Sequence, residues 1–195
     1  MAGAHEAMEH HEHAQHAAGD NKKIALLIAV LALFLAFSET LGKSAQTEGI
    51  GYNVEASNLW AFFQAKTIRR TLVQTAAEEL KVSSTPADEA GKAAIAKQIE
   101  EWTKTAARYR SEPETREGSV ELAEGAKEAE HKRDTSLARY HHYEVASAAF
   151  QIGIVLSSAA IITGMIALAW VAGVAGILGI GFMGIALIAP HAVHF

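Results

Sequence analysis

Residues 24–37 read IALLIAVLALFLAF, and residues 145–189 read VASAAFQIGIVLSSAAIITGMIALAWVAGVAGILGIGFMGIALIA. A helix that is apolar on every side needs either lipid or a large protein core around it. A chain of 195 residues is too short to enclose such helices in a water-soluble core. These stretches therefore predict an integral membrane protein. Core helices of a soluble protein are the alternative.

The first apolar stretch predicts a membrane-spanning helix over residues 22–42. Lys22 and Lys23 precede it, and Glu39 near its end must reach the interface if the helix attains the roughly 20 residues that a bilayer core requires. A cleaved signal peptide is the alternative. We favour a retained anchor, because the preceding residues are long for a signal sequence and no good small-x-small cleavage site follows.

The C-terminal apolar stretch predicts two more membrane-spanning helices, over residues 145–170 and 174–190, followed by a tail of residues 191–195. The link between them, about Ala172-Gly173, is so short that they should form a tight antiparallel hairpin. Small residues four apart let helix backbones approach closely in lipid. The hairpin holds four such pairs: Gly153 and Ser157, Ala160 and Gly164, Ala172 and Gly176, and Ala175 and Gly179.

Most charged residues lie in the middle region, residues 43–144. Thr85 is a candidate N-cap and Pro86 a candidate first residue for a new helix after a turn near Ser83-Ser84, and an interruption is expected at Ser111-Glu112-Pro113. Apolar residues at helical spacing suggest three packing stripes. These are Ile50, Val54, Ala61, Ile68 and Leu72 in the first, Ile95, Ile99, Trp102, Ala106 and Tyr109 in the second, and Leu122, Ala126, Ala129, Leu137 and Tyr140 in the third.

The predicted fold is an all-α membrane protein with three transmembrane helices. A charged antiparallel helical hairpin, or coiled coil, lies between the first helix and the second. The packing surfaces of this hairpin are rich in alanine and bury little apolar area, so a single hairpin would be only marginally stable. We therefore expect copies of the chain to associate along these surfaces.

The run Asn58-Leu-Trp-Ala-Phe-Phe-Gln-Ala-Lys66, with Lys43–Glu48 before it, resembles the bacterial membrane proteins of domain-of-unknown-function family 4337 (DUF4337). The likeness extends over most of the chain. It implies a bacterial membrane location and brings no activity, cofactor or catalytic residue.

The same run is the most distinctive candidate site. Bulky aromatics beside polar and basic residues suit a membrane interface or a helix–helix contact. The alternatives are a packed corner of the helical domain and a specific site for a partner or a lipid headgroup. The candidate partner or interface residues are Asn58, Trp60, Phe62, Phe63, Gln64, Lys66 and Arg69.

The N-terminal tail, residues 1–21, is rich in histidine and glutamate. Imidazole and carboxylate groups suit Zn, Cu or Ni, and on a helix His10 and His13 share a face that His16 continues. The tail is therefore a candidate for weak binding of one of these metals, and a flexible solvated tail is the alternative. No other cofactor is expected.

Several function classes are disfavoured by composition and motif. The chain has no cysteine, which excludes disulfides, thiolate metal sites and thiol catalysis. Its net charge is −5 without an obvious basic stripe, which argues against nucleic acid as a partner. No nucleophile elbow, phosphate loop, dinucleotide fingerprint or HExxH occurs, so we do not expect an enzyme.

We therefore expect a multi-pass protein of the bacterial inner membrane that serves as a scaffold or accessory subunit. Its partners would be the lipid bilayer and further copies of itself or a larger membrane complex. The alternative is a metal-binding or transport-associated protein that uses the His-rich tail. The positive-inside signals conflict, and four basic residues before the second membrane segment favour a cytoplasmic middle domain. They are Lys127, Lys132, Arg133 and Arg139.

Overall fold

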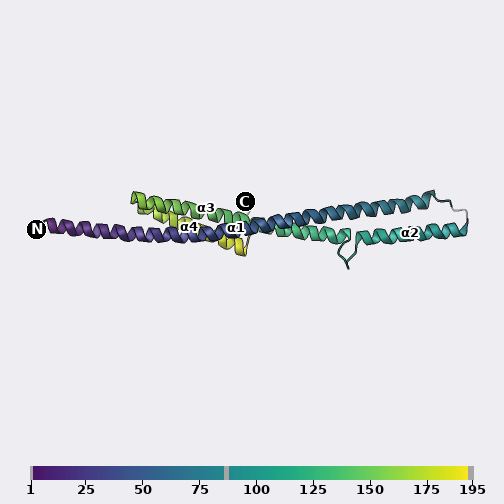
Figure 1. The fold of residues 1–195 in the computed structure, drawn as a ribbon, viewed down its shortest axis with the longest axis horizontal. Coiled ribbons are helices and arrows are strands. Elements are labelled where there is room, and N and C mark those ends of the chain that lie inside the picture. Colours follow the sequence, from purple (N-terminus) through teal and green to yellow (C-terminus); the bar gives the residue numbers. More distant parts are fainter. Residues whose placement is uncertain (1, 86–87, 193–195) are drawn as a thin grey trace. The chain divides into compact units, whose positions relative to one another are not determined.

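The chain folds into helices. A computed structural model describes the backbone of residues 2–85 and 88–192, and the side chains of residues 22–85 and 88–192. Within those ranges it contains four helices and no strand (Figure 1). They are α1 (Ala2–Ser83), α2 (Glu89–Arg110), α3 (Ser119–Thr163) and α4 (Ile166–Ile188).

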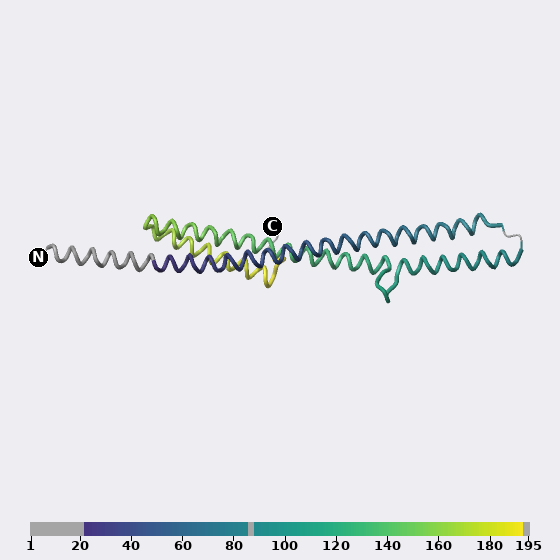
Figure 2. Tube along the Cα trace, viewed as in Figure 1, coloured from purple at the N-terminus to yellow at the C-terminus, as the bar shows by residue number. Residues whose placement is uncertain are grey.

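These helices form two compact units. The terminal unit comprises Met1–Glu48 and Thr135–Phe195, and the middle unit comprises Gly49–Asp134. Helices α1 and α3 contribute residues to both. In Figure 2 the purple part of α1 is followed along the chain by the teal α2, the green α3 and the yellow α4.

The terminal unit is held together by large side chains that pack against glycines. A Cβ atom added at Gly176 would lie 2.7 Å from Leu31 Cδ2, and one at Gly153 would lie 3.0 Å from Leu31 Cδ1. Phe150, fully buried, stacks on Phe34 with ring centroids 5.8 Å apart. The small residues thus let α1 approach both α3 and α4 closely, as expected for helices that pack in lipid.

Three helices of the described chain are long and apolar enough to cross a membrane. They are the part of α1 that starts at Lys22, together with α3 and α4. Large apolar side chains are exposed in the apolar stretch of each: Leu26 of α1 and Val155 of α3 are each 66% exposed, and Trp170 of α4 is 76% exposed.

The turn between the last two helices differs from the sequence-based prediction. A link at Ala172-Gly173 is wrong, because both residues lie inside α4. Helix α3 ends at Thr163, and Gly164 follows with φ +70°, a left-handed conformation that glycine adopts without steric cost. The helix predicted over residues 145–170 corresponds to the second part of α3, which ends at Thr163. The helix predicted over residues 174–190 corresponds to α4, which begins at Ile166.

The middle unit is an antiparallel pairing of α1 with α2 and α3. Lys132 lies over the Tyr52 ring at 5.9 Å, and Lys66 lies over the Tyr109 ring at 5.4 Å. From Tyr52 to Lys66 the chain of α1 advances, while its contacts move back from Lys132 in α3 to Tyr109 in α2. Helix α1 is therefore antiparallel to α2 and α3. The predicted helical hairpin geometry is therefore present in this unit.

The face of α1 that closes this pairing is not the predicted one. Ile50, Val54, Ile68 and Leu72 are between 54% and 68% exposed, and Ala61 is exposed as well. The opposite face is buried or half-buried at steps of three and four, so the seam has a seven-residue repeat. Its members are Gly49, Tyr52, Ala56, Leu59, Phe63, Lys66, Arg70, Val73, Ala77 and Leu80. The three small members, Gly49, Ala56 and Ala77, are buried, and the seven larger members are half-buried.

The other helices follow the predictions more closely. The expected stripe of α2 is buried or half-buried, and so is that of α3, where Leu122, Ala126 and Ala129 are buried. The interruption at Ser111 is confirmed, because α2 ends at Arg110.

The start of α2 is a further correction. Thr85 is not its N-cap, and Pro86 lies outside the described residues. Asp88 is the cap, and the backbone N–H of Gly91 donates to its Oδ1 at 2.7 Å. A carboxylate there accepts a hydrogen bond and also opposes the positive end of the helix dipole.

Candidate interface site on the first helix

The seven predicted site residues of α1 do not form one patch. Trp60, Phe63 and Lys66 are half-buried. The remaining four are exposed: Asn58, Phe62, Gln64 and Arg69. Because an α-helix has 3.6 residues per turn, a consecutive run of residues necessarily occupies every side. The structure thus separates residues that serve the packing of the middle unit from residues that are open to a partner.

Trp60 anchors α1 to α3 within the middle unit. Its indole Nε1–H donates to Oε1 of Glu130 at 2.9 Å. The Phe63 ring meets the Trp60 ring edge-on, with centroids 5.4 Å apart and an interplanar angle of 88°. Edge-to-face pairs of this kind add to the stability that burial of the rings provides. These two aromatics therefore belong to the packed corner that the sequence left as one alternative.

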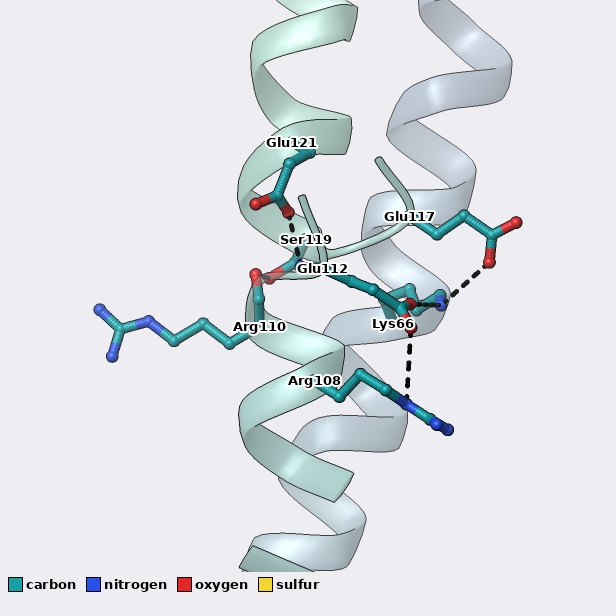
Figure 3. Close-up of polar contacts among 7 residues, drawn as sticks. All are labelled: Lys66, Arg108, Arg110, Glu112, Glu117, Ser119 and Glu121. Carbon is teal, nitrogen blue, oxygen red and sulfur yellow. Dashed lines mark hydrogen bonds and ion pairs between the residues drawn. The ribbon is translucent and has the colours of Figure 1, made fainter. Parts of the chain in front are cut away.

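Lys66 brings a positive charge to the junction of α2 and α3. Its Nζ lies 3.5 Å from Oε2 of Glu117 and 3.9 Å from Oε2 of Glu112 (Figure 3). The same ammonium group lies over the Tyr109 ring. The Lys66 side chain is only 13% exposed, and Glu112 is 23% exposed. The pair is therefore less screened by water than an ordinary surface ion pair.

Glu121 ties together the two ends of the junction between α2 and α3. The Ser111 hydroxyl donates to Oε1 of Glu121 at 2.5 Å, and the backbone N–H of Glu112 donates to its Oε2 at 3.2 Å. These hydrogen bonds, led by the one from Ser111, hold the pKa of Glu121 below its ordinary value of 4.5. Ser119 adds a hydrogen bond from its hydroxyl to the Arg110 carbonyl at 3.2 Å (Figure 3).

Gly118 is required at this junction for steric reasons. A Cβ atom there would lie 2.6 Å from both Cα of Ser111 and the backbone nitrogen of Glu112. The sequence-based prediction of an interruption at Ser111-Glu112-Pro113 did not identify the roles of Glu112, Glu117 and Glu121. The available signal was the glycine followed three residues later by a glutamate, a spacing typical of helix N-termini.

The side chains at this junction hold the helices of the middle unit together. Their charged groups pair with one another, and among the residues whose side chains are described no group of three His, Asp or Glu could hold a metal ion. The proposed metal ligands His10, His13 and His16 lie outside those residues.

Comparison with known proteins agrees with the sequence resemblance. Residues 20–189 match the family model described as Domain of unknown function (DUF4337). The chain belongs to this family. No curated protein and no solved structure matches it. The DUF4337 match includes all three membrane-capable segments and the whole middle unit, and it begins after the His-rich residues of the tail.

The terminal unit of this DUF4337 chain also carries polar contacts between its apolar helices. The Ser38 hydroxyl donates to the Tyr143 carbonyl at 2.8 Å, and the Gln151 amide donates to Glu39 at 3.3 Å. His142 is buried and its Nε2 lies 2.9 Å from the Pro190 carbonyl oxygen. Such contacts fix the position of each helix against its neighbour, because polar groups among apolar helices need partners.

Proposed function

We propose that this DUF4337 protein is a membrane-anchored helical scaffold or accessory subunit. Its three apolar helices would cross a bilayer, and its middle unit would stand outside the lipid as a coiled coil that mediates assembly. The observation that carries the proposal is the exposed apolar surface of the terminal unit, of which Trp170 and Ile188 are examples.

The free energy of solvation supports insertion into lipid. Each Å² of apolar surface that leaves water stabilises a protein by roughly 25 cal/mol. The apolar stretches of the three helices, residues 24–37 of α1, 145–163 of α3 and 166–188 of α4, present such surface on their outward faces. A soluble monomer rarely keeps a contiguous apolar patch of that extent in contact with water.

The middle unit offers exposed helix faces for binding, and its half-buried charges are not among them. Its half-buried charges are used to hold its own helices together, as Lys66 does with Glu112 and Glu117. We therefore assign it recognition and not catalysis. We also propose the bacterial inner membrane as its location, with the middle unit cytoplasmic, because basic residues are concentrated just before the second membrane-capable segment.

Native purification tests this function. The full chain would be extracted from membranes in a mild detergent, and the mass of the intact complex would be measured. The proposal expects a mass of at least two chains, or of one chain with a stoichiometric protein partner. A monodisperse single chain without a partner, in detergent and in native membranes alike, would contradict the scaffold role.

A further inference from the structure

The middle unit leaves one apolar face of α1 uncovered. This outer stripe consists of Ile50, Val54, Ala61, Ala65, Ile68 and Leu72, all exposed. At 100° per residue these positions cluster within about 40° of Ala61, on the side of α1 opposite the seam. Ala56 and Ala77 of the seam are buried, while Ile68 and Leu72 of the outer stripe are each 68% exposed.

We infer that the outer stripe is the surface through which two copies of this chain associate side by side. This inference rests on the proposed function and identifies its assembly surface. When the two-fold axis runs parallel to the paired helices, each residue lies close to its own counterpart, so the interface tolerates neutral residues and penalises like charges. The stripe has no charged member from Ile50 to Leu72, and Glu79 ends it on the same side of the helix.

The spacing of the stripe suits packing against an identical helix. Ile50, Ala61 and Leu72 are eleven residues apart, and so are Val54 and Ala65. An eleven-residue repeat corresponds to about 3.67 residues per turn, which suits nearly straight helices with a slight right-handed supercoil. The small residues Ala61 and Ala65 lie at its centre, where they allow the two backbones to approach, with bulky residues on both sides.

The size of the stripe points to a copy held in the same bilayer. From Ile50 to Leu72 it spans roughly 33 Å of helix. A single helix face of that length offers less than the roughly 800 Å² per partner of a standard interface. Confinement of both copies to one membrane raises their effective concentration, which compensates for a small interface. Two copies with the same membrane topology can also be related by a two-fold axis along the membrane normal, which turns the same face of each copy toward the other.

Disulfide mapping tests the inference, because the chain has no cysteine of its own. Ala61→Cys places a thiol at the centre of the stripe. Ala93→Cys, on an exposed position of α2, is the matched control. After mild oxidation of native membranes, we expect a disulfide dimer of twice the chain mass to form at least about tenfold faster in Ala61→Cys than in Ala93→Cys.

A second substitution ties the dimer to the stripe itself. Adding Ile68→Glu to Ala61→Cys puts two like charges at the two-fold contact, and it should lower the rate of disulfide formation by about tenfold. Helicity should stay unchanged, because Ile68 is exposed within its own chain. Adding Ala93→Glu to Ala61→Cys instead should leave the rate as it was.

Three outcomes would overturn the inference. These are equal rates for Ala61→Cys and Ala93→Cys, an adduct whose mass is not twice that of the chain, and immersion of a spin label at position 61 in lipid. If the native complex still exceeds one chain in mass while Ala61→Cys does not cross-link, the scaffold stands and only the stripe fails. A native complex of one chain without a partner contradicts the proposed function as well.

Discussion

At the scale of single residues, Lys66 and Glu121 organise the junction where α2 ends and α3 begins. Lys66 reaches across from α1 to Glu112 and Glu117. Glu121 accepts hydrogen bonds from Ser111 and from the backbone of Glu112. Neither role is visible in helical periodicity, because each contact joins residues far apart on the helices or in a loop.

Replacing Lys66 by methionine should destabilise the middle unit. The substitution Lys66→Met keeps the length of the side chain and leaves Glu112 with only the more exposed of its two cations, Arg108 at 3.8 Å, at a cost of about 1 kcal/mol. Arg69→Met is the control, since Arg69 is exposed on the same helix. Urea titration of the detergent-solubilised chain, followed by circular dichroism, measures both. Equal losses of stability would show that the Lys66 contacts contribute nothing specific.

The hydrogen bonds to Glu121 predict a dependence of stability on pH. A carboxyl group whose pKa is lower in the folded state stabilises the fold above its unfolded pKa, here about 4.5, and loses this contribution as the pH falls through the folded value. Glu121→Gln should therefore lower the melting temperature at neutral pH, and the gap from wild type should close in acid. Glu124→Gln, exposed on the same helix, is the control. A gap that stays constant with pH would refute this role of the Glu121 charge.

At the scale of elements, the turn between α3 and α4 depends on one glycine. Gly164 has φ +70°, a region that costs an alanine about 1 to 2 kcal/mol. Gly164→Ala should lower the melting temperature in detergent. Gly173→Ala, inside α4 with open space around it, should leave it unchanged or raise it, because alanine is the better helix former. The reverse ranking would place the turn at Ala172-Gly173.

The packing of α3 against α4 depends on a second glycine. A Cβ atom at Gly179 would lie 2.6 Å from Cε1 of Phe150, whose ring is fully buried. Gly179→Ala should cost about 1 to 3 kcal/mol, because the ring has little room to move. Gly181→Ala meets nothing within 4 Å and serves as the control. Thermal unfolding in detergent compares the two, and an unaffected Gly179→Ala would argue against this close contact.

At the scale of the whole molecule, the apolar terminal unit should determine where the protein is found. We expect the full chain to sediment with membranes after cell lysis, to stay there in alkaline carbonate, and to enter solution only with detergent, since its exposed apolar surface is stable only in lipid. Immunoblotting of the fractions measures this. Recovery in the supernatant without detergent would remove the basis of the proposed function.

The number and character of the long apolar segments could be predicted from sequence, and so could the interruption of α2 at Ser111. The turn at Gly164 could not, because glycines also lie inside α4 and only their backbone conformations separate them. The sequence also could not show that the candidate site residues divide between two sides of α1: Trp60 and Lys66 pack inward, while Phe62 is 62% exposed. Adjacency in the sequence does not tell which side of a helix packs against the neighbouring helices.

By itself the sequence determined that this protein is helical, that three of its segments suit lipid, and that it belongs with DUF4337. Only the tertiary structure decided which side of α1 closes the middle unit. Helical periodicity offers two rows on opposite sides of α1, one containing Ala56 and Ala77 and the other Ile50 and Ile68. The choice depends on the partners that α2 and α3 supply. Lys66 of the seam meets Glu112 and Glu117, and Tyr52 meets Lys132, and such contacts between residues far apart in sequence cannot be read from the periodicity of one helix.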